Sequence, residues 1–267
     1  FLTFKKSQSS NSNDLLFPII LEHSCWFIKL SEMGVFLYSL IRFKKALLFY
    51  HSVEGLLMDE RYYKTRFTFN KKRDKVWSAI VSHIQKYIPK EAIVLDLGCG
   101  YGNFINNVQA KEKHAIDLNK DFKSHLAENV QFKAGSVLDL KHLKKNYFDV
   151  VFASNLLEHL DHKENDSLLQ SIKSLLKPEG RLILIQPNYR YSQKKYFDDY
   201  THKTAHSHVS IRDLLNAKGF SVVKLVPRFL PFSLKSKLPK SKLLTKIYLK
   251  LPYKPFAKQM LIVARLK

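Results

Sequence analysis

Three of the eight glycines in this chain stand at alternate positions in one short segment, VLDLGCGYGNF (94–104). An apolar run, AIVLDLG (92–98), leads into them and is typical of a strand that is buried on both faces. Because glycine has no Cβ atom, Gly98, Gly100 and Gly102 allow the backbone to turn tightly and to bring its amides close to a ligand. The segment therefore predicts a ligand-binding turn directly after a buried strand.

Segments typical of strands and helices alternate from residue 71 onward. Strands are expected at 92–98, 114–118, 130–135, 148–154, 181–187, 220–226 and 259–266. Helices are expected at 71–88, from Asn103 to 111, and at 120–128, 164–177 and 210–219. This alternation with short connections is typical of a parallel α/β sandwich. The last two strands lack an ordinary helical crossover, which predicts an antiparallel strand at one edge of the sheet.

Local signals mark where several of these helices begin and end. Pro89 ends the first helix, and KPEG (177–180) is expected to close the 164–177 helix with a turn. Ser210 is expected to cap the start of the 210–219 helix, and Gly219 to end it.

A dinucleotide-binding loop is the alternative interpretation of the glycine segment. Such a loop has glycine at its first, third and sixth positions. Counted from Gly98, the sixth position is Asn103. This difference argues against a nicotinamide dinucleotide as the ligand.

Four segments together carry a resemblance to a known family. VLDLGCGYGNF resembles the first motif of class I S-adenosylmethionine-dependent methyltransferases. HAIDLN (114–119), FDVVFASNLLEHL (148–160) and LKPEGRLILIQPN (176–188) resemble the following motifs, in order and at the usual intervals. The resemblance covers about residues 75–267. It implies an α/β fold with a Rossmann-like, seven-stranded, mostly parallel sheet, an antiparallel last strand and helices on both faces.

The same resemblance implies S-adenosyl-L-methionine as the cofactor and assigns residues to it. These residues are Asp96, Gly98, Cys99, Gly100, Gly102, Asp117, Leu118, Ser136, Val137 and Asn155. The glycine loop would hold the methionine part of the cofactor, and Asp96 would order that loop and bind the ammonium group. Asp117 would accept hydrogen bonds from both ribose hydroxyls, Leu118 would pack on the adenine, and Asn155 would line the methyl-transfer site.

This sequence departs from the family at the adenine end of the cofactor site. The family often has an acid where this chain has Ser136. Recognition of the adenine amino group is therefore left to Ser136, to the Val137 amide or to the nearby Asp139.

Histidines and acids provide the candidates for the acceptor side. The resemblance places Glu158 and His159 beside the acceptor site. A second group, DDYTHKTAHSH (198–208), lies where such folds usually cover the acceptor pocket, and His202 is its candidate general base. The alternative is that this group holds the segment in place through hydrogen bonds and caps the following helix.

Metal dependence is not expected from the sequence. Quinone-pathway O-methyltransferases resemble NLLEHL (155–160), but they carry an additional acid at the position of Asn155. Glu158 and His159 alone do not make a metal site. YFDDYTH (196–202) is similar to bacterial methyltransferases found with polysaccharide and lipid synthesis, which favours acceptors of that kind.

The charge of the chain is strongly positive and concentrated near its end. Lys and Arg exceed Asp and Glu by 45 to 23, and residues 214–267 contain 13 Lys or Arg and no acid. In KSKLLTKIYLKL (240–251) an apolar helical stripe of Leu244, Ile247, Tyr248 and Leu251 runs beside a stripe of lysines. Such a helix can lie on anionic lipid or bind a phosphate-bearing substrate, or its stripe can pack on its own domain.

These observations define the function that we expect. The chain is interpreted as a cytoplasmic S-adenosylmethionine-dependent methyltransferase that methylates oxygen on a small, glycosidic or lipid-linked acceptor, with peripheral contact to a membrane left open. The alternatives are an RNA methyltransferase, for which no base-methylating tetrapeptide or RNA-binding module is present, and a non-catalytic cofactor-binding subunit. The two cysteines, Cys25 and Cys99, form no metal or disulfide framework.

The expected domain organisation has three parts. Residues 1–57 form an N-terminal extension of uncertain role, in which the apolar segment 15–30 is too short and too interrupted by charge to span a membrane. Residues 58–91 form an N-terminal helical segment, and residues 92–267 form the methyltransferase domain with lid segments at 188–210 and 228–258.

Overall fold

The computed structural model describes residues 68–231 and 241–267. The expected N-terminal extension, the first ten residues of the helical segment and the 232–240 part of the second lid segment lie outside the described residues. All the described residues belong to one compact unit of the chain.

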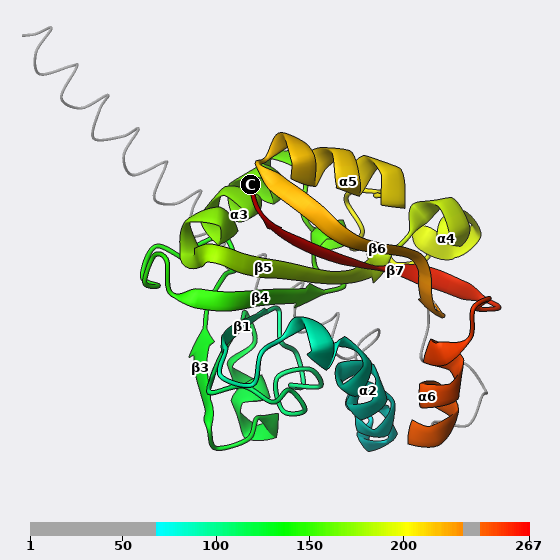
Figure 1. Ribbon diagram of the computed structural model, residues 1–267, viewed down its shortest axis with the longest axis horizontal. Helices are drawn as coiled ribbons and strands as arrows, with labels where there is room; N and C mark the ends of the chain where they lie inside the picture. Colours follow the sequence, from blue (N-terminus) through cyan, green and yellow to red (C-terminus); the bar gives the residue numbers. More distant parts are fainter. Residues whose placement is uncertain (1–67, 232–240) are drawn as a thin grey trace, which may run out of the picture. The chain divides into compact units, whose positions relative to one another are not determined.

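A seven-stranded sheet with the order β3-β2-β1-β4-β5-β7-β6 forms the centre of this unit (Figure 1). Its strands are β1 (Ile93–Leu97), β2 (Glu112–Asp117), β3 (Val130–Ala134), β4 (Phe148–Ser154), β5 (Leu176–Pro187), β6 (Phe220–Pro231) and β7 (Ala257–Leu266). The pairs among β1 to β5 are parallel, and β7 is antiparallel to both of its neighbours. The expected strands and the antiparallel last strand are confirmed, but β7 lies between β5 and β6 rather than at the edge.

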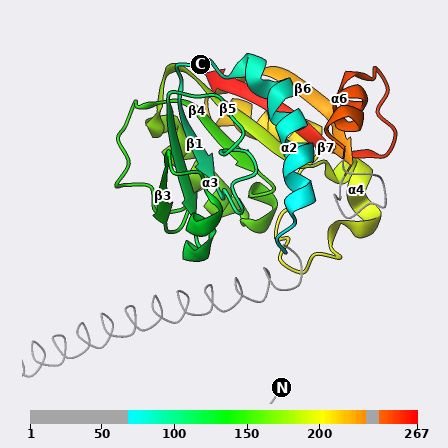
Figure 2. The same ribbon diagram turned by 90° about the horizontal axis from the view of Figure 1, so that it is seen from below.

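Helices cover both faces of the sheet, which confirms the predicted fold class. The helices α3 (His162–Leu175) and α5 (His208–Ala217) lie on one face, and α2 (Lys71–Ile84) and α6 (Lys242–Lys250) lie side by side on the other (Figures 1 and 2). Each face has its own core of buried Leu, Ile, Val and Phe side chains. A further helix, α4 (Tyr189–Tyr196), follows the carboxyl end of β5 directly.

The helix expected after the glycines is absent from the described chain, where residues 101–107 form a series of turns instead. Asparagine side chains explain the difference, because they bond to backbone groups in competition with a helix. Asn106 donates to the His125 carbonyl and accepts from the Ala127 amide, and Asn107 donates to the Asn103 carbonyl. The segment is therefore held by these side chains, and the expected 120–128 helix is a short 3₁₀ helix, Lys120–His125.

Two expected helix boundaries are also wrong. The α3 helix ends at Leu175, and KPEG forms a bulge inside β5, where Glu179 has a positive φ of 65°. Ser210 does not cap α5, because the chain enters that helix three residues earlier. The cap is Ser207, whose hydroxyl oxygen accepts from the Ser210 amide while the Ser210 hydroxyl oxygen accepts from the Ser207 amide.

We expect Ser207→Ala to lower the free energy of unfolding by about 1 kcal/mol, because the first turn of α5 loses the acceptor for one of its amides. Urea denaturation followed by circular dichroism measures this loss. Ser82→Ala, at an exposed position inside α2, is the control and leaves stability within about 0.5 kcal/mol of wild type. Equal stability of Ser207→Ala and Ser82→Ala would contradict the cap.

Candidate functional site

The glycine turn follows β1 with a backbone that other residues would strain. Gly98, Gly100 and Gly102 have φ values of 68°, 51° and 71°. A Cβ atom at Gly102 would collide with the Leu126 side chain and stand 2.8 Å from Nδ2 of Asn106. The turn therefore requires glycine for both its conformation and the space around it.

Asp117 ends β2 and holds the glycine turn from the neighbouring strand. Its carboxylate accepts from the amides of Gly100 at 2.8 Å and Asn119 at 3.1 Å, and its side chain is buried. Since each carboxylate oxygen has two lone pairs, Asp117 can accept further hydrogen bonds. The adjacent Leu118 is 50% exposed, so it leaves an apolar surface next to this carboxylate.

Asp96 of β1 is a second buried carboxyl group, and it lies near enough to Asp117 for their charges to interact. It accepts a hydrogen bond from the Ile105 amide in the turn after the glycines, but its Oδ2 atom has no hydrogen-bond partner in the described part of the chain. Burial, and then the charge of Asp117, raise the pKa of Asp96 well above its usual range. A cationic ligand would compensate both carboxylates, because a buried charge is stable when an opposite charge pairs with it.

Of the other predicted cofactor residues, Cys99 and Ser136 form hydrogen bonds with backbone groups. Cys99 is buried, its amide donates to the Ile116 carbonyl, and burial raises the pKa of its thiol. Ser136 accepts from the Leu138 amide, and Val137 is buried while Asp139 is exposed.

Asn155 lies immediately after β4 with a positive φ of 51°. Its side-chain oxygen accepts from Nε2 of Gln259 on β7 at 2.7 Å, and its Nδ2 donates to Ser154. This residue is exposed, and its contact with Gln259 joins the ends of β4 and β7.

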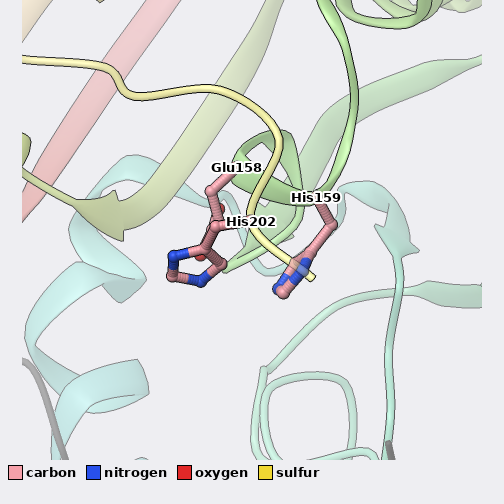
Figure 3. A group of neighbouring side chains, drawn as sticks. All are labelled: Glu158, His159 and His202. Carbon is pink, nitrogen blue, oxygen red and sulfur yellow. The ribbon is translucent and has the colours of Figure 1, made fainter. Parts of the chain in front are cut away.

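Glu158, His159 and His202 come together, as expected for the acceptor side (Figure 3). Glu158 and His159 belong to the 3₁₀ turn η3 (Leu157–His159) after β4, and His202 comes from the loop between α4 and α5. One nitrogen or oxygen atom from each side chain lies within 4.8 Å of those from the other two. The two imidazole rings have centroids 5.0 Å apart.

Backbone bonds fix the loop of His202 onto η3. The carbonyl of Glu158 accepts from the amides of Lys203 and Thr204, and the Thr204 hydroxyl donates to the Leu157 carbonyl. The buried Asn165 of α3 also donates to the Leu157 carbonyl, at 3.0 Å. The backbone position of His202 therefore follows from the contacts of the two residues that come after it.

A hydrogen-bonded chain sets the tautomer of His159. The Thr201 hydroxyl donates to Oδ1 of Asp199 at 2.6 Å and lies 2.9 Å from Nδ1 of His159. Since the hydroxyl has one proton and donates it to Asp199, Nδ1 of His159 carries a hydrogen and donates to Thr201. The lone pair of the imidazole is then on Nε2.

Burial changes the pKa values of these groups in opposite directions. It raises the pKa of Glu158 to about 8, and the charge of Asp199 adds to this rise. It lowers the pKa of His159 to about 4, and a positive charge on His202 lowers it further. Burial alone would raise the pKa of Asp199, but hydrogen bonds from Thr201 bring it below its usual range. With no cation bound, these shifts favour the neutral forms of Glu158 and His159.

The other members of the predicted histidine group are not among the three side chains that come together. His206 is buried, and burial lowers its pKa to about 4. His208 begins α5, and its Nδ1 lies 3.0 Å from Nδ2 of Asn188. Asp198 is exposed. The contact of His208 is of the kind that the scaffold alternative expects, and His202 is the histidine that lies beside Glu158 and His159.

Sequence reasoning missed Gln186, Thr201 and Thr204. Gln186 is 2% exposed at the carboxyl end of β5, and neither atom of its side-chain amide has a hydrogen-bond partner within residues 68–231 and 241–267. A single polar residue in the run LILIQP (182–187), at the end of a parallel strand where ligands bind, was the available signal. No sequence signal distinguishes the two threonines, whose roles depend on tertiary contacts.

The glycine turn, the two buried carboxyl groups and the acceptor-side residues all follow the carboxyl ends of parallel strands. This arrangement is characteristic of α/β proteins that bind a nucleotide-like cofactor at that edge of the sheet. The unpartnered oxygen of the buried Asp96 fits a cofactor with a positive charge beside the turn.

Comparison with known proteins identifies the family. The family described as methyltransferase domain matches residues 69–225, which is more than half of the chain. The chain belongs to this family, and its cofactor is S-adenosylmethionine.

Relatives in sequence cover only part of the chain. It is 33% identical over 138 residues to an uncharacterized protein of Methanocaldococcus jannaschii, a match that covers 50% of this chain and 57% of that protein. It is 29% identical over 115 residues, 40% of this chain, to a phosphoethanolamine N-methyltransferase of Plasmodium falciparum. It is 26% identical over 152 residues, 53% of this chain, to phosphoethanolamine N-methyltransferase 1 of Triticum aestivum. The matches span 42% and 28% of these two enzymes.

Solved structures share the fold. A SAM-dependent methyltransferase from Archaeoglobus fulgidus superposes with a TM-score of 0.52 and 23% identity, over 71% of this chain and 94% of that chain. A methyltransferase from Mesorhizobium loti gives a TM-score of 0.52 and 14% identity, over 70% and 97%. At these identities the likeness is one of fold.

We expect Asp96→Asn to be more stable than wild type by about 1 kcal/mol or more near pH 8, in the absence of cofactor. The folded chain keeps a proton on Asp96 at pH values where the unfolded chain has lost it, so the free energy of unfolding falls as pH rises above the ordinary Asp pKa of about 3.9. Urea denaturation at several pH values measures this, and the gap between the two chains narrows toward acidic pH.

Asp213→Asn, on an exposed position of α5, is the control and shifts stability by less than about 0.5 kcal/mol at every pH. A wild-type chain at least as stable as Asp96→Asn at the alkaline end would contradict the raised pKa of Asp96.

Proposed function

We propose that this chain is an S-adenosylmethionine-dependent methyltransferase that methylates an oxygen atom of a small, glycosidic or lipid-linked acceptor. One observation carries the proposal: the glycine turn with Asp96 and Asp117, and the group of Glu158, His159 and His202, follow strands whose carboxyl ends share one edge of the sheet. The residues for a cofactor and the residues for proton removal are thus both present at this edge of the sheet.

The cofactor residues have separate tasks in this proposal. Asp117 binds the ribose hydroxyls while it keeps the turn in place through Gly100. Asp96 faces the positive charge of the methionine part, and Leu118 packs on the adenine with its exposed side chain. When bound, the cofactor supplies a methyl group activated by a positively charged sulfur.

The acceptor residues deal with the proton of the hydroxyl. The acceptor oxygen bonds to the methyl carbon as the carbon–sulfur bond breaks, the electron pair of that bond stays on sulfur, and the hydroxyl proton must leave the oxygen. Glu158, His159 and His202 are the titratable groups that support this step. His159 presents the lone pair of Nε2 in a fixed orientation through Thr201 and Asp199.

Methylation of an amine nitrogen is the second candidate. The similarity to the two phosphoethanolamine N-methyltransferases favours it. An amine that reaches the site already neutral needs no base before it attacks, whereas a hydroxyl must lose its proton. If transfer is unaffected by loss of His159, the amine acceptor gains support.

Peripheral contact with an anionic membrane is the proposed role of α6. The apolar stripe predicted from the sequence is mostly exposed: Leu244 and Ile247 are 48% and 50% exposed, and Leu243 beside them is 66% exposed, whereas Leu249 packs inward. The exposed Lys242, Lys246 and Lys250 lie next to this apolar surface. Such a combination suits adsorption to anionic lipid, and no helix in the described ranges has the length and apolar character needed to cross a bilayer.

We expect Asp117→Ala to weaken binding of S-adenosylmethionine and of its demethylated product by about 10- to 100-fold, because charge-assisted hydrogen bonds to the ribose are lost. Isothermal titration measures the affinity. His159→Asn keeps that affinity and lowers labelled-methyl transfer into cell-extract fractions by about 100-fold or more.

Asp213→Ala changes neither quantity and serves as the surface control. The proposal fails if the wild-type chain does not bind the cofactor, or if Asp117→Ala binds it as tightly as wild type does.

We expect the wild-type chain to sediment with phosphatidylcholine vesicles that contain phosphatidylglycerol, and to do so less as salt rises. The double variant Leu243→Asp, Ile247→Asp loses this binding because the apolar surface becomes charged. Val223→Asp, at an exposed apolar position on β6, is the matched control and keeps it. Equal sedimentation of wild type and the α6 variant would refute the membrane role.

A further inference from the structure

Two separate segments supply the three side chains that meet beside the acceptor site. Glu158 and His159 are neighbours in η3, whereas His202 lies about forty residues further along the chain. All three ligand atoms lie within 4.8 Å of one another, a separation that allows one ion between them (Figure 3). In the sequence only Glu158 and His159 stand together, and the fold brings His202 to them.

The donor set selects the kind of ion. Two imidazole nitrogens and one carboxylate oxygen suit Zn²⁺ and other divalent first-row transition metals. Mg²⁺ and Ca²⁺ prefer sites made of oxygen ligands. Three protein ligands also leave a coordination position open for an oxygen of another molecule, as catalytic zinc sites do.

The surroundings of His159 resemble those of a metal-binding imidazole. Metal-ligating histidines usually donate their second ring N–H to a carboxylate, a carbonyl or another polar group, which fixes the ring. Nδ1 of His159 donates to the Thr201 hydroxyl, which donates in turn to Asp199. Nε2 therefore carries the lone pair that coordination of an ion requires.

Glu158 gives an independent indication of a cation. Its side chain is 2% exposed, and Oε2 has no hydrogen-bond partner among the residues that the structure describes. Buried carboxylates are generally paired with an opposite charge or bound to a metal. The backbone of Glu158 is fixed by Lys203 and Thr204, so the side chain is held inside the protein.

We propose that Glu158, His159 and His202 bind one divalent transition-metal ion, and that the open coordination position takes the acceptor oxygen. The inference rests on the proposed function, and it explains how this trio of side chains acts on the hydroxyl group of the acceptor. A hydroxyl bound to the ion has a lowered pKa and releases its proton to solvent. The resulting oxygen then forms its bond to the methyl carbon as the carbon–sulfur bond breaks, and both electrons of that bond stay on sulfur.

Titration of the full chain with Zn²⁺, after treatment with a chelator and its removal, tests the site. One equivalent binds to the wild-type chain, with a weaker response to Mg²⁺. His202→Asn and Glu158→Gln, which keep the approximate shape of each side chain, each lower Zn²⁺ affinity by about tenfold or more. His142→Ala removes an exposed histidine outside the site and keeps the wild-type affinity. Replacement of Zn²⁺ by Co²⁺ produces visible absorption bands that disappear in His202→Asn.

The outcomes separate this inference from the proposed function. A chain that binds S-adenosylmethionine but gives no Zn²⁺ binding, or Zn²⁺ binding unaffected by His202→Asn and Glu158→Gln, overturns the metal site and leaves the cofactor assignment in place. A chain that binds Zn²⁺ through the trio but ignores the cofactor overturns the proposed function instead. Circular dichroism of each variant shows whether it is folded, and thermal denaturation with and without Zn²⁺ gives a second readout, since the ion stabilises only a chain that binds it.

Discussion

The hydrogen bond from the Gly100 amide to the buried carboxylate of Asp117 connects the ends of β1 and β2. It fixes a turn whose positive φ values at Gly98, Gly100 and Gly102 favour glycine. A second carboxyl group, Asp96, lies in the same buried region and binds the turn through the Ile105 amide. Two acids near each other in a protein interior are stable when one of them keeps its proton or when a cation compensates them, and a cationic cofactor would supply that compensation.

The acceptor side depends on a different kind of constraint. The loop that carries His202 is attached to η3 by backbone bonds at Glu158 and by the Thr204 hydroxyl. Asn165 reaches the same turn from α3. These buried contacts place the His202 loop against η3. The geometry of Glu158, His159 and His202 therefore follows from tertiary packing and not from one continuous sequence motif.

The sequence allowed the sheet and the glycine turn after β1 to be predicted. Apolar runs and punctuating glycines locate the strands, and Asp117 follows from its position after the second of them. The turns at 101–107 could not be foreseen, because the Asn106 and Asn107 side chains find partners that only the folded chain provides. The sequence placed His202 on the same side as Glu158 and His159, but the close approach of the three side chains depends on tertiary contacts of the loop and could not be predicted. The exposed side of α6 was also undetermined, because a stripe of apolar residues can face either the core or the solvent.

A crystal structure of the chain with S-adenosylhomocysteine, the demethylated cofactor, tests the central claim most directly. The account predicts that the nucleoside lies against the glycine turn, with both ribose hydroxyls within about 2.5–3.0 Å of the Asp117 carboxylate and the amino group of the methionine part facing Asp96. A nucleoside bound elsewhere, or a ribose that makes no contact with Asp117, would contradict it.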